Sequence, residues 1–211
     1  MNIKKYILIS TFFGSLCSMT SAETFYIGGG VGASDFNTKA SVGTASLDES
    51  GTGFKIYGGW HINDFFSVEY FYNDYGSATL SGSNGQTFTW DGAAYQFTAT
   101  AEIELSAWAT GFTPMIGYEI PINNGGAFKS IRPYAKFGYQ FWEAEITETT
   151  SSTTATVLSA DGWDYIGGLG VFLNFDFNGV PIGIRGEYEQ TGTADNTDDI
   201  SMFSGSIFYN F

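Results

Sequence analysis

Apolar and polar residues alternate with a period of two along much of the chain, and the pattern is clearest over residues 203–211. The apolar residues on one face of this stretch are Phe203, Ile207, Tyr209 and Phe211, with Gly205 between them. The other face is polar except for Phe208. Because a strand points successive side chains to opposite faces, it presents an apolar wall to one medium and a mostly polar wall to another. The apolar wall is either the core face of a soluble sandwich or the lipid-facing surface of a closed barrel, in which no strand edge is exposed.

The same alternation predicts eight strands. They cover residues 24–34, 53–60, 65–75, 104–118, 131–146, 162–173, 180–190 and 203–211. After the N-terminal segment there is no run of about 18 apolar residues, so a membrane would be crossed by strands and not by helices. The pattern therefore predicts an all-β fold, an eight-stranded antiparallel up-and-down transmembrane β-barrel.

The predicted connections alternate between long and short. The longer ones are loops at 35–52, 76–102, 147–159 and 191–199, with a hairpin within 76–102, and the shorter ones are turns at 61–64, 119–130 and 174–179. Outer-membrane barrels place short turns in the periplasm and long loops outside the cell. An even number of strands leaves both ends of the barrel domain on the periplasmic side.

The first 22 residues have the pattern of a cleaved secretory signal peptide. Lys4 and Lys5 form a basic segment, residues 6–17 are mostly apolar, and small residues at 20–22 precede a predicted cut before Glu23. A membrane anchor would need about 20 apolar residues. A lipoprotein would be acylated at Cys17, where the preceding Leu16 is a poor fit. We therefore predict a signal peptide at 1–22 and one barrel domain at 23–211.

The composition indicates that part of the protein surface faces a medium other than water. Aromatic residues make up 18% of the chain and charged residues 14%, whereas soluble domains average about 25% charged residues. Without Lys4 and Lys5, 6 basic residues stand against 22 acidic ones. This balance argues against nucleic acid and anionic surfaces as partners.

Several short segments, in this order, resemble a known family. They are Gly58-Gly59-Trp60, Glu69-Tyr70-Phe71-Tyr72, Gly117-Tyr118, Tyr134-Ala135-Lys136-Phe137-Gly138, Arg185-Gly186-Glu187-Tyr188 and Tyr209-Asn210-Phe211. The chain resembles the eight-stranded outer-membrane protein A-like barrels, also called the outer-membrane β-barrel domain, with opacity-type porins among their relatives.

The resemblance implies the outer membrane of a Gram-negative bacterium, with its lipids and lipopolysaccharide as surroundings. It also implies assembly by the barrel-insertion machinery, which reads a C-terminal aromatic strand such as Phe203, Ile207, Tyr209 and Phe211. Larger members of the family carry a further peptidoglycan-binding domain, which we do not expect here.

Among the charged residues that alternation places towards the lumen, five are predicted to form a cluster: Lys55, Glu69, Lys136, Arg185 and Glu187. The resemblance matches Glu69 and Glu187 to acidic members of a lumenal cluster, whereas Met115 and Thr197 stand where it implies a lysine and an arginine. Buried charges need partners. The cluster is thus either a structural plug in a barrel too narrow to conduct or the gate of a small pore.

No other residues give strong evidence of catalysis, cofactor binding or metal binding. The single histidine, His61, lies in a predicted turn, where we expect it to be solvated, and Glu143 and Glu145 have no spacing that favours catalysis, so we predict that the protein is not an enzyme. A glycine pattern near Gly28 is followed by no βαβ unit, and we expect no cofactor. The acidic residues Asp195, Asp198 and Asp199 could bind calcium or bridge to lipopolysaccharide through divalent ions, but a solvated loop is the simpler interpretation and we predict no metal site.

The function predicted from the sequence is a structural or surface-interaction role in the outer membrane, with a lumen largely plugged by side chains. One alternative is a narrow porin-like channel or a carrier for small solutes. Another is a surface adhesin or antigen that binds a host or surface ligand through its outer loops.

Overall fold

The computed structural model describes residues 24–123, 125–193 and 198–211, and every helix or strand assigned in those ranges is a β-strand. The predicted signal peptide, with Cys17, lies outside the described residues, as do Asp195 and Thr197. Within the described part there is no helix long and apolar enough to cross a membrane.

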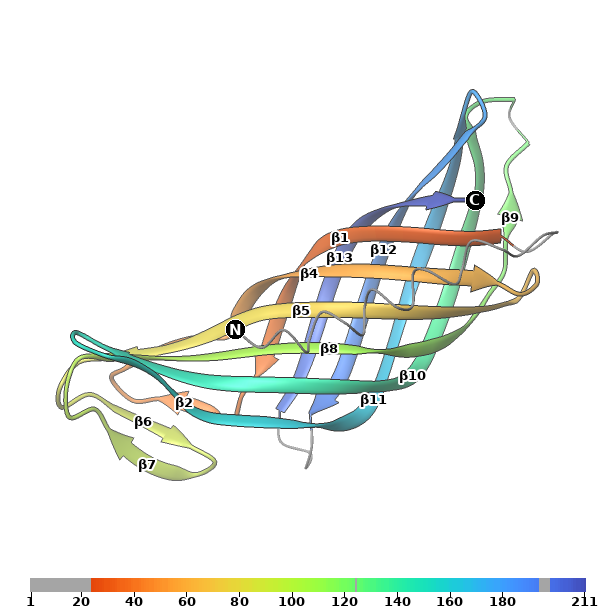
Figure 1. Cartoon of the computed structure of the whole chain (residues 1–211). Helices are drawn as coiled ribbons and strands as arrows, with labels where there is room; N and C mark the ends of the chain where they lie inside the picture. Colours follow the sequence, from red (N-terminus) through yellow and green to blue (C-terminus); the bar gives the residue numbers. More distant parts are fainter. Residues whose placement is uncertain (1–23, 124, 194–197) are drawn as a thin grey trace.

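Eight long antiparallel strands form a closed barrel, which confirms the predicted fold class (Figure 1). They are β1 Thr24–Asn37, β4 Ser50–His61, β5 Phe66–Gly82, β8 Ala101–Gly117, β10 Phe128–Thr150, β11 Thr154–Phe177, β12 Val180–Thr193 and β13 Asp198–Asn210. Each pairs with the next in this series, and β13 pairs with β1 to close the ring. Closure removes the sheet edge that an open sheet would expose.

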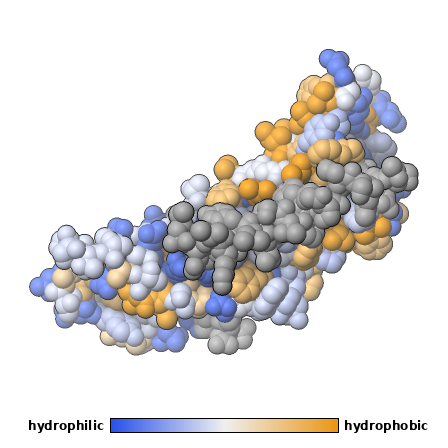
Figure 2. Space-filling view, viewed as in Figure 1, coloured by the Kyte–Doolittle hydropathy of each residue, from blue (hydrophilic) through white to orange (hydrophobic). Residues whose placement is uncertain are grey.

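The alternation of side chains sorts the strands into an apolar outer wall and a filled interior. Val31 and Leu169 point outward and are 66% and 64% exposed, whereas Tyr26 and Phe71 point inward and are fully buried. Figure 2 shows orange, hydrophobic side chains along the visible barrel wall. The inward and outward residues are those that the period of two predicts, because neighbouring residues of a strand face opposite sides.

The two ends of the barrel differ. One end, here the turn end, carries the connections 62–65, 118–127 and 178–179, with the short strand β9 Ile120–Pro121 in the second. Phe211 lies at this end as well, and its backbone N–H donates to the carbonyl oxygen of Phe25 at 2.8 Å. The opposite end, here the loop end, carries the other four connections. The two longest connections, which follow β1 and β5, lie at the loop end as predicted, but the turn-end connection 118–127 is longer than the loop-end connection 151–153.

Two of the predicted loops are mostly strand. Instead of a loop over 147–159, β10 runs to Thr150 and β11 begins at Thr154, so that only residues 151–153 turn the chain. Likewise β12 reaches Thr193 and β13 begins at Asp198, within the predicted loop 191–199. The prediction for 147–159 was wrong because it took a high Ser and Thr content as a loop signal, whereas β-branched threonine suits a paired strand.

The turn predicted at 174–179 is also shorter than expected. β11 continues to Phe177, and Asn178 and Gly179 alone connect it to β12, with φ angles of 56° and 86°. Positive φ at both central residues defines a type I′ hairpin turn, which Asn-Gly adopts readily.

A small three-stranded sheet extends the loop end. It comprises β2 Ala40–Val42, β6 Thr87–Trp90 and β7 Ala93–Gln96, while β3 Ser46–Asp48 pairs with β5 (Figure 1, lower left). Asp91 and Gly92 connect β6 to β7 with φ angles of 48° and 78°, another type I′ turn. This is the hairpin expected within 76–102.

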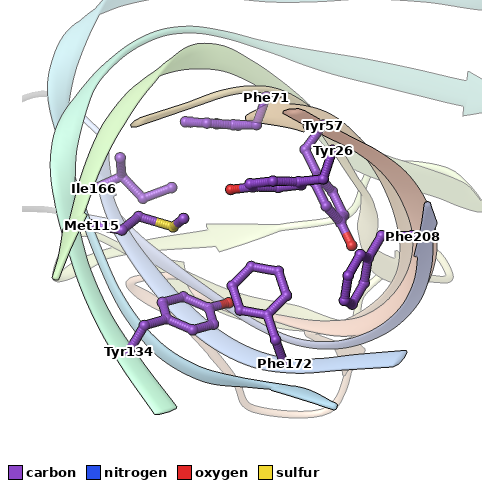
Figure 3. Packing of buried hydrophobic residues seen from close by; sticks show 8 residues of the cluster. All are labelled: Tyr26, Tyr57, Phe71, Met115, Tyr134, Ile166, Phe172 and Phe208. Carbon is purple, nitrogen blue, oxygen red and sulfur yellow. The ribbon is translucent and has the colours of Figure 1, made fainter. Parts of the chain in front are cut away.

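Of the three clusters of buried apolar side chains in the described residues, the two larger ones fill the interior. The aromatic cluster consists of Tyr26, Tyr57, Phe71, Met115, Tyr134, Ile166, Phe172 and Phe208, and Figure 3 shows these side chains pointing into the barrel from the surrounding strands. The loop-side cluster consists of Phe36, Tyr75, Ala78, Ala107, Ala109, Trp142, Ile200 and Met202. Inward glycines make room for the rings: a Cβ at Gly59 would lie 2.2 Å from Cζ of Tyr26.

Candidate functional site

Six charged side chains meet inside the barrel, and we call them the lumenal network. They are Lys55 on β4, Glu69 on β5, Lys136 on β10, and Arg185, Glu187 and Glu189 on β12, and each is at most 4% exposed. Alternation places them there, since Ile184 and Tyr188 of β12 face outward while the charged residues between and beside them face inward.

The two lysines bind the carboxylates of β12. Lys55 Nζ lies 2.5 Å from Glu187 Oε1, 2.9 Å from Glu189 Oε1 and 3.7 Å from Glu69 Oε1. Lys136 Nζ contacts Glu189 and lies 3.0 Å from Glu187 Oε1 and 4.0 Å from Glu69 Oε1. Each lysine is thus shared among the same three carboxylates.

Arg185 makes the most directional contacts. Its Nη1 contacts Glu69 Oε2, its Nη2 donates to Glu69 Oε1 at 3.1 Å, and Nη2 also contacts Glu187. Such a forked arginine–carboxylate pair fixes orientation as well as charge. In the ring of eight strands, β5 and β12 are four strands apart, so this pair joins opposite walls.

Three cations face three carboxylates, so the lumenal network carries no net charge. Isolated charges in a protein interior cost several kcal/mol each, and removal of one partner from a buried pair typically costs about 3–5 kcal/mol. The network is therefore balanced in charge and sensitive to the loss of any member.

Tyrosine hydroxyls and aromatic faces complete the surroundings. Tyr26 Oη donates to Glu69 Oε2 at 3.1 Å, and Tyr134 Oη donates to Glu187 and accepts from Arg185 Nε at 2.5 Å. The Arg185 guanidinium lies 4.3 Å from the centre of the Tyr57 ring, within cation–π range. Hydrogen bonds and ring faces thus replace the water that the charges have lost.

The structure brings the five predicted lumenal residues together and adds a sixth, Glu189. The alternation placed Glu189 inward as well, but the family resemblance pointed only to Glu69 and Glu187. Met115, which stands where the resemblance implies a lysine, is the direct cross-strand partner of Lys136 and belongs to the aromatic cluster. The lysine of this chain therefore comes from the neighbouring strand at the same level.

His61 is not a solvated turn residue, so this prediction was wrong. β4 includes His61, and the alternation turns its side chain inward at the turn end, where it is half-buried. Its ring stacks on Tyr26 with centroids 4.8 Å apart, and Nδ1 lies 2.7 Å from Ser67 Oγ. Arg132 Nη2 donates to the same hydroxyl at 3.0 Å, so His61, Ser67 and Arg132 form a polar group at the turn end of the barrel.

The remaining predicted residues lie apart from the lumenal network. Glu145 is exposed, and Glu143 pairs in register with Asp161 of β11 near the loop end. In the ranges that the structure describes, no group of three or more His, Cys, Asp and Glu residues could hold a metal ion. Asp195 and the side chain of Asp198 are outside those ranges.

The C-terminal residues lie on the outer wall. Phe203, Ile207 and Phe211 are 65%, 65% and 70% exposed, and Tyr209 is 40% exposed. The ring of Phe211 lies 5.5 Å from that of Phe25 and 4.9 Å from that of Tyr209, centre to centre. The four side chains form one apolar row on β13 and just beyond it.

Comparison with known proteins gives one family match. Residues 8–211 match the family model described as Outer membrane protein beta-barrel domain. No curated protein sequence matches the chain.

Solved structures share the fold at low identity. Ail, the attachment invasion locus protein of Yersinia pestis, is 13% identical over 90% of this chain and 100% of its own, with a TM-score of 0.51. OprG from Pseudomonas aeruginosa is 13% identical over 90% and 96%, with a TM-score of 0.45. Neisserial surface protein A is 12% identical over 90% and 100%, with a TM-score of 0.47.

Proposed function

Because the chain belongs to the outer-membrane β-barrel domain family, we propose that it is an outer-membrane barrel with a plugged lumen. Its role is structural or surface-interacting and is carried out at the loop end. The observation that carries this proposal is the neutral lumenal network, which joins opposite walls of the barrel.

The width of the barrel supports a plug. Eight strands leave an interior just wide enough for side chains to fill. Here the aromatic cluster surrounds the charges, and further towards the loop end the same strands contribute the loop-side cluster, as Tyr75 follows Asn73 on β5 and Trp142 follows Gln140 on β10. A solute would have to displace both clusters and separate the ion pairs.

We propose that residues 1–22 are a cleaved signal peptide, which would place the turn end in the periplasm and the loop end outside. The apolar outer wall would face membrane lipids, and lipopolysaccharide would surround the loop end. The exposed row Phe203, Ile207, Tyr209 and Phe211 supports recognition of β13 by the barrel-insertion machinery.

The loop end is the surface most suited to a partner. The β2–β6–β7 sheet and the extended β10–β11 hairpin form ordered surfaces there. Of the basic residues that the structure describes, only Lys39 lies at this end, and it pairs with Asp91 at 3.7 Å. Ail has been solved with the heparin analogue sucrose octasulfate, but here the scarcity of basic residues argues against a sulfated ligand and favours a neutral or cationic one.

We propose no catalytic role. The single histidine of the chain, His61, contacts Tyr26 and Ser67 at the turn end, and the acidic residues Glu143 and Glu145 lie near the other end. A general acid or base must reach the proton that it transfers.

Single-channel recording in planar bilayers tests the plug. The mature protein, with folding checked by heat-dependent gel mobility, should give a silent membrane. Discrete openings of the wild type that change in Glu69→Ala would instead show that the lumenal network gates a pore, and the plug proposal would fail. Glu145→Ala is the matched control, because it removes an exposed carboxylate outside the network.

A further inference from the structure

One stretch of β11 has a free edge. Residues 154–161 follow β10 on one side, but the ladder between β11 and β12 begins only at the pair Ile166 and Thr191. At that register the last residue of β12, Thr193, lies level with Asp164. Among the strands that the structure describes, none pairs with residues 154–161 on the other side. The β10–β11 hairpin therefore extends past β12 with one row of backbone N–H and C=O groups that has no strand partner (Figure 1).

This edge has few of the features that protect edge strands. Every residue from 154 to 161 is exposed, although the side chains of a strand face alternate sides. Natural edge strands are short or carry lysine, proline or a bulge. Residues 154–161 include neither lysine nor proline, and their charged residue is Asp161. A bulge lies at Val157, which the register with β10 leaves without a partner. The segment is otherwise suited to accept a further strand.

The edge lies beyond the part of the wall that suits a membrane. On the outer face, the rings of Trp163 and Tyr165 lie 5.5 and 5.3 Å from that of Tyr139, centre to centre. Exposed aromatic residues mark the membrane interfaces of outer-membrane barrels. The next outward residues of β11 towards the hairpin tip are Asp161 and Ser159, which are polar. A backbone edge without a partner is not tolerated among lipid tails, and beyond the aromatic residues it is open to a partner in water.

The surroundings of the edge are acidic. No lysine or arginine occurs between Lys136 and Arg185 in the sequence, an interval that includes the tip of the hairpin and the whole free edge. Glu145 and Glu148 of β10 and Asp161 of β11 are exposed there. An acidic segment would be repelled at this edge, whereas lysine or arginine would meet opposite charge.

We propose that residues 154–161 bind an extended polypeptide segment that carries lysine or arginine and adds to β11 as a further strand. Backbone hydrogen bonds along the edge supply the affinity, and the acidic side chains select the charge of the partner. Eight residues of strand span about 26 Å, enough for several such bonds. This inference rests on the proposed surface-interacting role and names the chemistry of its partner.

The hairpin shows which backbone groups face the edge. Thr150 N–H donates to the carbonyl oxygen of Thr153 at 2.8 Å, so these two residues form a hydrogen-bonded pair. Hydrogen-bonded and non-hydrogen-bonded pairs alternate along an antiparallel ladder. Thr154 and Thr156 therefore stand in non-hydrogen-bonded pairs with β10, and their N–H and C=O groups point to the free edge. Thr156→Pro thus removes a donor from the edge and no bond from the ladder, in a position where proline is tolerated.

A matched set of three peptides tests the proposal. The probe is dye-labelled Lys-Thr-Val-Thr-Val-Thr-Lys, titrated with the protein in phosphatidylcholine nanodiscs while its fluorescence anisotropy is measured. One control peptide carries a methyl group on every central amide nitrogen, and the other has glutamate in place of both lysines. We expect saturable binding of the probe and none to empty nanodiscs. Methylation should weaken binding by at least about tenfold, because several backbone hydrogen bonds are lost. Glutamate should weaken it by about threefold.

Two substitutions at one residue locate the binding, with folding checked by heat-dependent gel mobility. Thr156→Pro should weaken binding of the probe by about fivefold, as the loss of one net hydrogen bond predicts. Thr156→Val keeps the N–H and should bind like the wild type. The probe should also slow amide hydrogen exchange at Thr154 and Thr156 in the wild type, while the amides of β12 keep their rates.

Four results would overturn the proposal. They are no saturable binding of the probe, equal binding of the methylated peptide, equal binding of the glutamate peptide, and wild-type affinity in Thr156→Pro. A dimer of the wild-type protein in detergent that Thr156→Pro dissociates would also overturn it, because the edge would then belong to a second copy of the chain. Peptide binding is independent of conductance, so failure of the plug proposal would be seen separately.

Discussion

Arg185 on β12 holds Glu69 on β5 through both of its terminal nitrogens, from the opposite wall of the barrel and 116 residues away in the sequence. The pair links two strands that share no ladder hydrogen bonds. It therefore stabilises the cross-section of the barrel in a direction in which the sheet itself does not.

Glu187→Ala should destabilise the barrel strongly. The carboxylate contacts Lys55, Lys136 and Arg185, so its removal leaves an uncompensated positive charge in the interior. We expect a loss of about 3–5 kcal/mol in the free energy of unfolding, measured by urea titration in lipid vesicles with tryptophan fluorescence. The exposed control Glu145→Ala should change it by less than about 0.5 kcal/mol. Equal effects of the two substitutions would show that the network is not stabilising.

Exchange of the cross-strand pair Lys136 and Met115 tests whether the lumenal lysine can come from either β10 or β8. Lys136 and Met115 are direct partners on β10 and β8 and both face the lumen. Lys136→Met should destabilise the barrel, and adding Met115→Lys should restore part of the loss, with a coupling energy of about 0.5–3 kcal/mol. The same urea titrations provide the four free energies, and strict additivity would refute the idea that the lysine can come from either strand.

Substitution of Gly30 by alanine tests how closely neighbouring strands pack on the lumenal side of the barrel wall. A Cβ at Gly30 would lie 2.2 Å from the backbone carbonyl oxygen of Gly205, whereas a Cβ at Gly205 would meet nothing within 4 Å. Gly30→Ala should therefore cost about 1–3 kcal/mol, since backbone atoms must move. Gly205→Ala should be neutral or slightly stabilising. Equal unfolding midpoints for the two variants would contradict this packing.

The hairpin turn of the outer sheet depends on Gly92. Its φ angle of 78° lies in the left-handed region, where a β-branched residue is strained by about 1–3 kcal/mol. Gly92→Val should increase amide hydrogen exchange in β6 and β7 while the barrel strands keep their protection. Asp91→Asn is the control, because asparagine tolerates the positive φ at its position. Unchanged exchange in Gly92→Val would show that the turn does not hold the sheet.

Phe211→Ala tests the role of the terminal aromatic residue in assembly. The side chain is 70% exposed on the outer wall, so its loss should affect the stability of the folded barrel little. We expect a several-fold lower amount of folded protein in the outer membrane, measured by heat-dependent gel mobility of membrane fractions. Phe112→Ala, also outward and 48% exposed, controls for loss of a lipid-facing ring. Equal yields of the two variants would argue against recognition through Phe211.

Much of the fold could be predicted from the sequence because successive residues of a barrel strand face the outside and the lumen in turn, so that apolar and polar residues alternate along the chain. The period of two alone placed Val31 and Ile207 outside and Lys55 and Glu187 inside. It also showed where strands exist, although not where they end. β10 and β11 extend well beyond the predicted boundary, because pairing between Thr149 and Thr154 is decided by the partner strand and not by composition.

The contacts within the lumen could not be predicted, because they depend on the strand order, tilt and register of the closed ring. The sequence by itself determined the apolar wall, the number of strands and a set of inward charges. Only the tertiary structure decided that Arg185 reaches Glu69, that Glu189 completes the balance of charge and that His61 turns under Tyr26. Alternation is a local property of the backbone, whereas these contacts join residues that only closure of the barrel brings together.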